Sequence, residues 1–275
     1  MNTKNLEKIR KRFTYPPENL DKLINLWKED KPISFYSWEC PPRQVQEDEK
    51  NGRWANFDVD IEKVVQGKKL DKFTELPRLT FAWKKEKWFI ENVIRKNPKA
   101  SYTKLIADTN GLYLYIKSKK ILGEKRIISL SKKFKKLIEG RSRELLGENS
   151  PKIILYTDLQ NNFKNEYEEF FNLVYKSLEK KNQQLISQDL VNYWKERLIV
   201  HIGLDQKDRS QKLDILKRVI ASYASEGMVF SLLDQKGIMP NPVWVNWEEK
   251  PESVQTTEIL RGRYGIACIP VIYFV

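Results

Sequence analysis

The residues with the clearest capacity for chemistry are three carboxylates in one short alternating segment. Residues 57–62 read Phe-Asp-Val-Asp-Ile-Glu. Side chains alternate along a β-strand, so Asp58, Asp60 and Glu62 share one face, with about 7 Å between successive Cβ atoms. A divalent cation would offset the repulsion between two such aspartates, and two-metal phosphoryl transfer uses such carboxylates. If the chain is an enzyme, we predict that Asp58 and Asp60 are its catalytic residues and bind Mg²⁺ or Mn²⁺. The alternative is a strand whose outer face carries solvated carboxylates.

The Asp58-x-Asp60 spacing is similar to the Asp-x-Asp strand of nucleotidyltransferases and primase-type polymerases. The similarity covers only these few residues. No Gly-Ser pair precedes them, and His201, the one histidine, lies far downstream in a predicted helix. Asp108 and Asp158 are further candidate ligands if the fold brings them close. Their alternative roles are to stabilise a turn, for Asp108, and to cap the following helix, for Asp158.

Positive charge is concentrated in the first part of the chain. The net charge is +13, and residues 101–150 alone hold 12 basic against 5 acidic side chains, whereas residues 151–275 hold 16 of each. A polyanion would relieve this repulsion by releasing its condensed counterions, and nucleic acid is the simplest such partner. The alternative is a basic surface that only keeps the protein in solution. The candidate phosphate-binding residues are Lys117, Lys119, Lys120, Lys125, Arg126, Lys132, Lys133, Lys135, Lys136, Arg141 and Arg143.

Two local patterns would position these cations. Ser131 is a candidate N-cap for a helix that runs to about Leu146, with an apolar face opposite most of its basic residues. The Asn110-Gly111 pair predicts a hairpin between residues 104–107 and 112–116. Tyr113 and Tyr115 would share one face of its second strand, where exposed rings beside lysines could stack on unpaired bases. A sheet packed on both faces would instead place these tyrosines in the core.

The remaining elements are strands and helices in alternation. We predict strands over residues 33–38, 54–61, 79–83, 153–157, 243–247 and 269–275, and helices over 17–29, 85–96, 161–181, 188–201, 211–224 and 226–235. We expect an α+β fold with a mixed, partly antiparallel sheet, several amphipathic helices and a more helical C-terminal half. The best boundary lies at residues 147–151, between a basic region, 1–146, and a neutral region, 151–275. The alternative is one continuous domain.

Composition excludes several classes of protein. Two cysteines and one histidine are too few for a disulfide scaffold or a multi-histidine metal centre. Neither G-x-G-x-x-G nor G-x-x-x-x-G-K-[ST] occurs, which argues against a nucleotide-binding ATPase, GTPase or Rossmann dehydrogenase. With no membrane span or signal peptide recognisable in the sequence, we expect a cytoplasmic protein.

Three functions fit these patterns. The leading hypothesis is a nucleic-acid-binding protein that holds a phosphate backbone with the basic helix and the adjacent aromatic sheet. The first alternative is the metal-dependent phosphoryl-transfer enzyme, nuclease-like or polymerase-like. The second alternative is a scaffold subunit of a nucleoprotein or defence-type complex, in which the neutral half contacts protein. An anionic membrane surface ranks last as the polyanion.

Overall fold

The structure is a computed structural model. It describes residues 13–14, 17–39, 85–106, 108, 132, 135–136, 138–140, 142–144, 146–179, 209–247 and 271–274. Its centre is one sheet with the strand order β1-β6-β5-β2-β3-β4. The strand bounds are Phe13–Thr14 for β1, Ile33–Glu39 for β2, Ala100–Ile106 for β3, Lys152–Leu155 for β4, Pro242–Asn246 for β5 and Val271–Phe274 for β6.

The sheet is parallel from β6 to β4. Every neighbouring pair in that range runs in the same direction, and only the two-residue edge strand β1 pairs antiparallel, with β6. Along the sequence the chain moves outward from β2 to β3 and β4, then returns to the other side of β2 for β5 and β6. This order corresponds to the doubly wound arrangement of α/β proteins, with its change of direction between β2 and β5.

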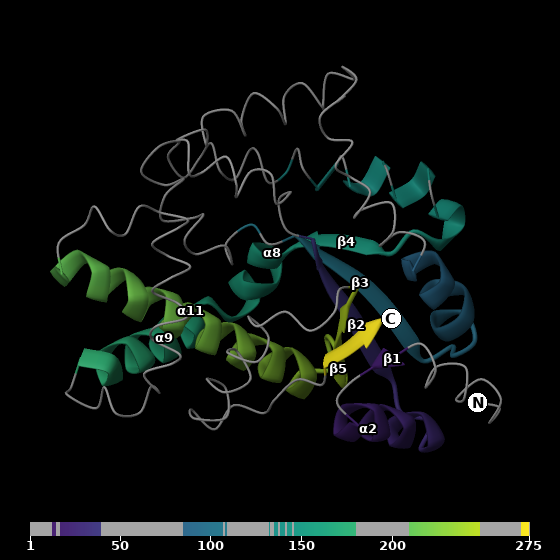
Figure 1. Ribbon diagram of the computed structural model, residues 1–275, viewed down its shortest axis with the longest axis horizontal. Coiled ribbons are helices and arrows are strands. Elements are labelled where there is room, and N and C mark those ends of the chain that lie inside the picture. Colours follow the sequence, from purple (N-terminus) through teal and green to yellow (C-terminus); the bar gives the residue numbers. More distant parts are fainter. Residues whose placement is uncertain are drawn as a thin grey trace.

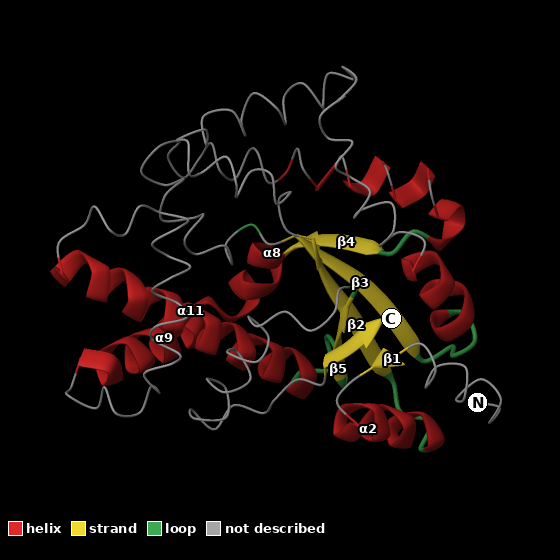
Figure 2. Cartoon of the chain, in the orientation of Figure 1, coloured by secondary structure: helices red, strands yellow, loops and turns green. Residues whose placement is uncertain are grey.

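Helices cover both faces of the sheet, as parallel pairing requires (Figure 2). On one face lie α2, Pro17–Lys28, and a helical segment over residues 85–94, the second half of which is the π-helix η3, Ile90–Ile94. Alternation along β2 sends Phe35 to this face, where it meets Trp27 and Phe89. The 3-10 helix η4, Gly147–Asn149, precedes β4.

The other face is covered by helices from after β4. They are α8, Tyr156–Gln160, the 3-10 helix η5, Asn161–Phe163, α9, Lys164–Glu179, and α11, Arg209–Gln235. Tyr36 of β2 points to this side, and its ring stacks on Phe230 of α11 with 4.4 Å between centroids. Helices α9 and α11 pack against each other and extend away from the sheet (Figure 1).

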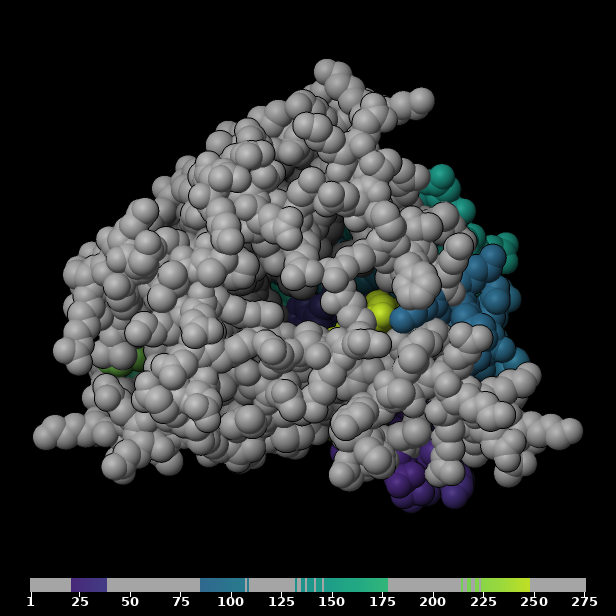
Figure 3. All heavy atoms as spheres, in the orientation of Figure 1, coloured from purple at the N-terminus to yellow at the C-terminus, as the bar shows by residue number. Residues whose placement is uncertain are grey.

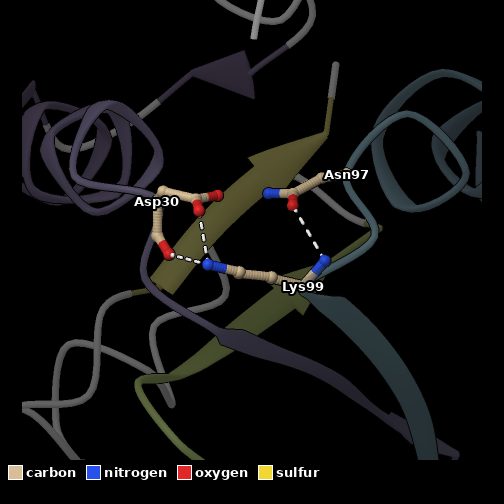
Figure 4. Close-up of polar contacts among 3 residues, drawn as sticks. All are labelled: Asp30, Asn97 and Lys99. Atoms are coloured by element: carbon tan, nitrogen blue, oxygen red, sulfur yellow. Dashed lines mark hydrogen bonds and ion pairs between the residues drawn. The ribbon is translucent and has the colours of Figure 1, made fainter.

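The amino edge of the sheet is closed by the chain's own polar groups. The Lys99 ammonium donates to the main-chain carbonyl of Asp30 at 3.0 Å and to its carboxylate (Figure 4). The Asn97 side-chain oxygen accepts the amide of Lys99 at 3.1 Å. These contacts connect the turn after α2 to the turn before β3, so the polar groups of these two turns bind each other.

The expected α+β class with a partly antiparallel sheet is wrong, because the fold is α/β. The Asn110-Gly111 pair predicts a hairpin and therefore an antiparallel pair of strands. Residues 104–106 instead belong to β3, whose two edges are already occupied by β2 and β4 in parallel register. The expected concentration of helix in the C-terminal half is also wrong, since α2 and residues 85–94 alternate with strands in the first half.

Several individual elements are confirmed. Strands occur where the sequence predicts them for β2, β4, β5 and β6, and helices occur at α2 and α9. The two helices predicted over 211–235 are one helix, α11. Ser225, which we expected to interrupt it, donates its hydroxyl to the Ala221 carbonyl one turn earlier, at 2.7 Å. A serine whose hydroxyl is satisfied in this way is tolerated inside a helix.

Strands from both sides of residues 147–151 pair in the same sheet, since β3 lies beside β4. The division into a basic and a neutral region stays a prediction. Among the helices that the structure describes, none has both the length and the apolar character needed to cross a bilayer.

Candidate functional site

The carboxyl edge of the parallel sheet is the candidate site. The winding direction changes between β2, which ends at Glu39, and β5, which ends at Asn246. In doubly wound α/β proteins, ligands bind in the crevice outside the carboxyl ends of the strands at such a point. The contacts at this edge therefore indicate what the chain could bind.

Two further segments meet at this same edge. β2 ends there at Glu39, and the helical segment 85–94 begins there, because the Lys85 ammonium donates to the carbonyl of Trp247 just after β5, at 3.2 Å. Asp58 and Asp60 lie outside the described residues, in the stretch between these two ends. Their predicted role as metal ligands stays a prediction.

Asp108 lies at this edge after β3 and caps the helix that follows β4. Its carboxylate accepts the Thr157 amide at 3.1 Å and also accepts the Thr157 hydroxyl. Thr157 is in the first turn of α8, where the N-cap residue, Leu155, offers no side-chain acceptor. Asp108, two residues after the end of β3, thus supplies the missing cap. This role differs from the turn role predicted for Asp108, and it is Asp108, not the predicted Asp158, that caps this helix.

Burial raises the pKa of Asp108 above the usual 3.8, and the hydrogen bonds from Thr157 lower it by less. The charge of nearby Asp158 adds to the increase. Asp158 is itself exposed. The structure therefore brings two of the four candidate carboxylates together. Within the part of the chain that the structure describes, no group of three or more histidine, cysteine, aspartate or glutamate side chains could hold a metal ion.

The predicted basic helix is present at every position described between residues 132 and 146. Ile138 and Leu146 anchor it, with 3% and 4% of their surface exposed. Lys132, Lys136 and Arg143 are exposed. Lys135 is half-buried, with its ammonium 3.9 Å from the Glu139 carboxylate. The remaining candidates lie outside the residues whose side chains are described: Tyr113, Tyr115, Lys117, Lys119, Lys120, Lys125, Arg126, Lys133 and Arg141.

The helix over 132–146 is oriented with its lysine-rich start toward the carboxyl edge. Its end is joined to the start of β4 through residues 147–151, so it runs back along the sheet against the strand direction (Figure 1). Teal atoms of this region reach the surface beside the blue atoms of residues 85–106 (Figure 3). The positive end of the helix dipole is also at its start, which makes lysines there unfavourable without an anion nearby.

A second group of polar side chains, which no motif in the sequence predicts, lies buried on the face covered by residues 85–94. Glu86 accepts hydrogen bonds from the Lys104 ammonium and the Tyr102 hydroxyl, both at 2.8 Å. The Tyr102 and Ser37 hydroxyls are 2.7 Å apart. We call these four residues the polar network. The signal for it was Lys104, which lies between Tyr102 and Ile106 on the alternating pattern of a buried strand.

Comparison with known proteins gives no relative: no protein-family model, no curated protein and no solved structure matches this chain.

Proposed function

We propose that this chain binds the phosphate backbone of a nucleic acid at the carboxyl edge of its sheet. The observation that carries the proposal is the row of exposed cations on the helix over 132–146, whose lysine-rich start is directed toward that edge. Cations at the start of a helix are unfavourable for the isolated fold, and a phosphate chain would remove that cost.

The exposed cations are arranged as one stripe. At 3.6 residues a turn, Lys132, Lys136 and Arg143 lie within about 40° of one another, and a rise of 1.5 Å a residue spreads them over about 16 Å. A nucleic-acid duplex presents several phosphates over that length, because each strand carries one about every 3.4 Å along the axis. Residues 131–146 hold six basic and two acidic side chains, so the surface stays positive although Glu139 lies within the stripe.

The test is the salt dependence of binding. We would measure fluorescence anisotropy of labelled single-stranded and duplex RNA and DNA against potassium chloride concentration. The double variant Lys132→Glu/Lys136→Glu should bind far more weakly. The slope of log affinity on log salt should fall by about 2 for a duplex, since each phosphate contact contributes about 0.9.

The matched control is Lys164→Glu/Lys176→Glu on α9, which makes the same charge change at two exposed lysines of the neutral half. It should leave the slope nearly unchanged. Equal losses in the two double variants would mean that only net charge matters. An unchanged affinity in the first variant would exclude this helix as the binding surface.

A second candidate function is metal-dependent phosphoryl transfer, with Asp58 and Asp60 as the proposed ligands. The observation in its favour is the pair Asp108 and Asp158, whose charges interact at the carboxyl edge. The Asp158 carboxylate is exposed and available to a cation, whereas that of Asp108 is held by Thr157. Calorimetry with manganese chloride should show binding to the wild-type protein and a loss of heat with Asp60→Asn. Absence of heat with the wild-type protein would exclude this function.

A further inference from the structure

The polar network is buried at a position that apolar side chains usually occupy. Lys104 and Glu86 expose 2% and 1% of their side chains. Phe89, on the next turn of the same helix, packs edge-on against Phe35 and Tyr102 at centroid distances of 5.1 and 5.7 Å. Transferring two charges into such surroundings costs several kcal/mol for each ion, so well-packed apolar residues are often equally stable in place of a buried ion pair.

The directions of the hydrogen bonds determine which donor pairs with which acceptor in the polar network. The single hydroxyl proton of Tyr102 goes to the Glu86 carboxylate, so the Ser37 hydroxyl donates to Tyr102. The two Glu86 oxygens receive different donors, one from Tyr102 and one from Lys104. Both oxygens are satisfied at 2.8 Å in the observed position of the helix, and a shift of the helix along the sheet would lengthen these bonds.

The network joins the start of one helix to the middle of the sheet. Glu86 contacts β3 through Tyr102 and Lys104, and reaches β2 through Ser37, which is the register partner of Lys104. Its neighbour Lys85 binds the main chain just after β5. The start of the helical segment 85–94 is therefore held against three strands around the point where the winding changes direction.

Apolar side chains make further contacts between this helix and the sheet. Phe89, Ile90 and Val93 lie in one cluster with aromatic and aliphatic residues of β2, β3 and β5. Such contacts are non-directional, and cores tolerate alternative packing while they lose uniqueness before stability. Apolar packing alone would leave the helix free to shift or rotate by a fraction of a turn.

We propose that the polar network is a conformational constraint, which sets the position of the helical segment 85–94 at the carboxyl edge and adds little net stability. It fixes the place where this helix begins, beside the main chain just after β5, independently of which ligand the edge binds. Glu86 and Lys104 are positioning residues in this account.

The experiment combines urea denaturation with hydrogen–deuterium exchange of the full chain. Lys104→Met alone leaves the Glu86 charge buried without its ion pair, and should lower the urea midpoint strongly. The double variant Glu86→Leu/Lys104→Met should recover most of that loss, because the Tyr102 hydroxyl can then donate to Ser37. Amides of residues 86–95 should nevertheless exchange about tenfold faster than in the wild-type protein, with β2 and β3 unchanged.

The control is Asp30→Asn/Lys99→Met, which removes an ion pair whose side chains are 74% and 48% exposed. It should change neither the midpoint nor the exchange of residues 86–95 appreciably. The proposal is overturned if residues 86–95 of Glu86→Leu/Lys104→Met exchange at the wild-type rate. It is also overturned if Glu86→Leu/Lys104→Met is as unstable as Lys104→Met or fails to fold, because the ion pair would then be a net source of stability.

Discussion

Asp108 offers a direct test of how the carboxyl edge is built. Its carboxylate accepts two hydrogen bonds from Thr157 at the start of α8, one from the amide and one from the hydroxyl. Asp108→Ala removes both. Loss of an N-cap acceptor costs about 1 kcal/mol, and loss of the second bond about 1 kcal/mol more. We therefore expect the free energy of unfolding to fall by about 2 kcal/mol near neutral pH.

Asp108→Asn separates the cap from the charge. The amide oxygen can still accept the Thr157 amide, so this variant should lose less stability than Asp108→Ala. The pKa of Asp108 is raised in the folded state, chiefly by burial. Because the folded state binds this proton more tightly than the unfolded state, protonation of Asp108 increases the free energy of unfolding. This contribution is complete below the usual pKa of 3.8 and is lost as the pH rises through the pKa of Asp108 in the folded protein. The amount by which wild type is more stable than Asp108→Asn, measured as the free energy of unfolding, should therefore decrease as the pH rises from 3.8.

The assay is urea denaturation followed by tryptophan fluorescence, repeated in steps from pH 3.5 to pH 7. Asp158→Ala, which alters the exposed neighbouring carboxylate, is the control and should change stability by about 0.5 kcal/mol or less. The reasoning is refuted if Asp108→Asn is as destabilising as Asp108→Ala. It is equally refuted if the advantage of wild type over Asp108→Asn grows with pH.

Three smaller predictions concern single backbone or side-chain features, each measured by urea denaturation. Gly140 lies within the basic helix with open space where a Cβ would be, so Gly140→Ala should add about 0.5–1 kcal/mol, and a loss would contradict the helical assignment. Asn241 has a φ of 46°, and its side-chain amide donates to the Pro32 carbonyl at 2.9 Å. Asn241→Ala should therefore be about 1 kcal/mol less stable than Asn241→Gly, which loses only the hydrogen bond, and the reverse order would contradict this account. Asn92, within the π-helix η3, donates its side-chain amide to the Trp88 carbonyl at 2.9 Å, so Asn92→Ala should cost about 1 kcal/mol, whereas no change would mean that water replaces the bond.

The sequence contained enough information to locate most described elements, but not to arrange them. β2 is rich in aromatic residues, β4 contains a short apolar run and α9 has helical periodicity, so local patterns were sufficient. The choice of strand partners is non-local. The Asn110-Gly111 pair was a strong local signal for a hairpin, yet β3 is already paired along both edges. The continuous apolar run in β4, residues 153–155, was the better indication of a parallel sheet, whose strands are buried on both faces.

The candidate site was predictable only in part, for the same physical reason. The exposed cations of the helix over 132–146 follow from its amphipathic pattern. The polar network does not, because Glu86 and Lys104 are 18 residues apart and meet only when the helix docks on the sheet. The capping role of Asp108 likewise depends on β4 lying beside β3, which places Thr157 within reach across 49 residues of sequence.

The most direct test of the central claim is lysine acetylation footprinting by mass spectrometry, with and without a saturating nucleic acid. If the lysine-rich start of the helix over 132–146 holds the phosphate backbone, Lys132 and Lys136 will be protected on binding, while Lys164 and Lys176 on α9 will react as they do in the free protein. Protection of the α9 lysines, with Lys132 and Lys136 still fully reactive, would contradict the account.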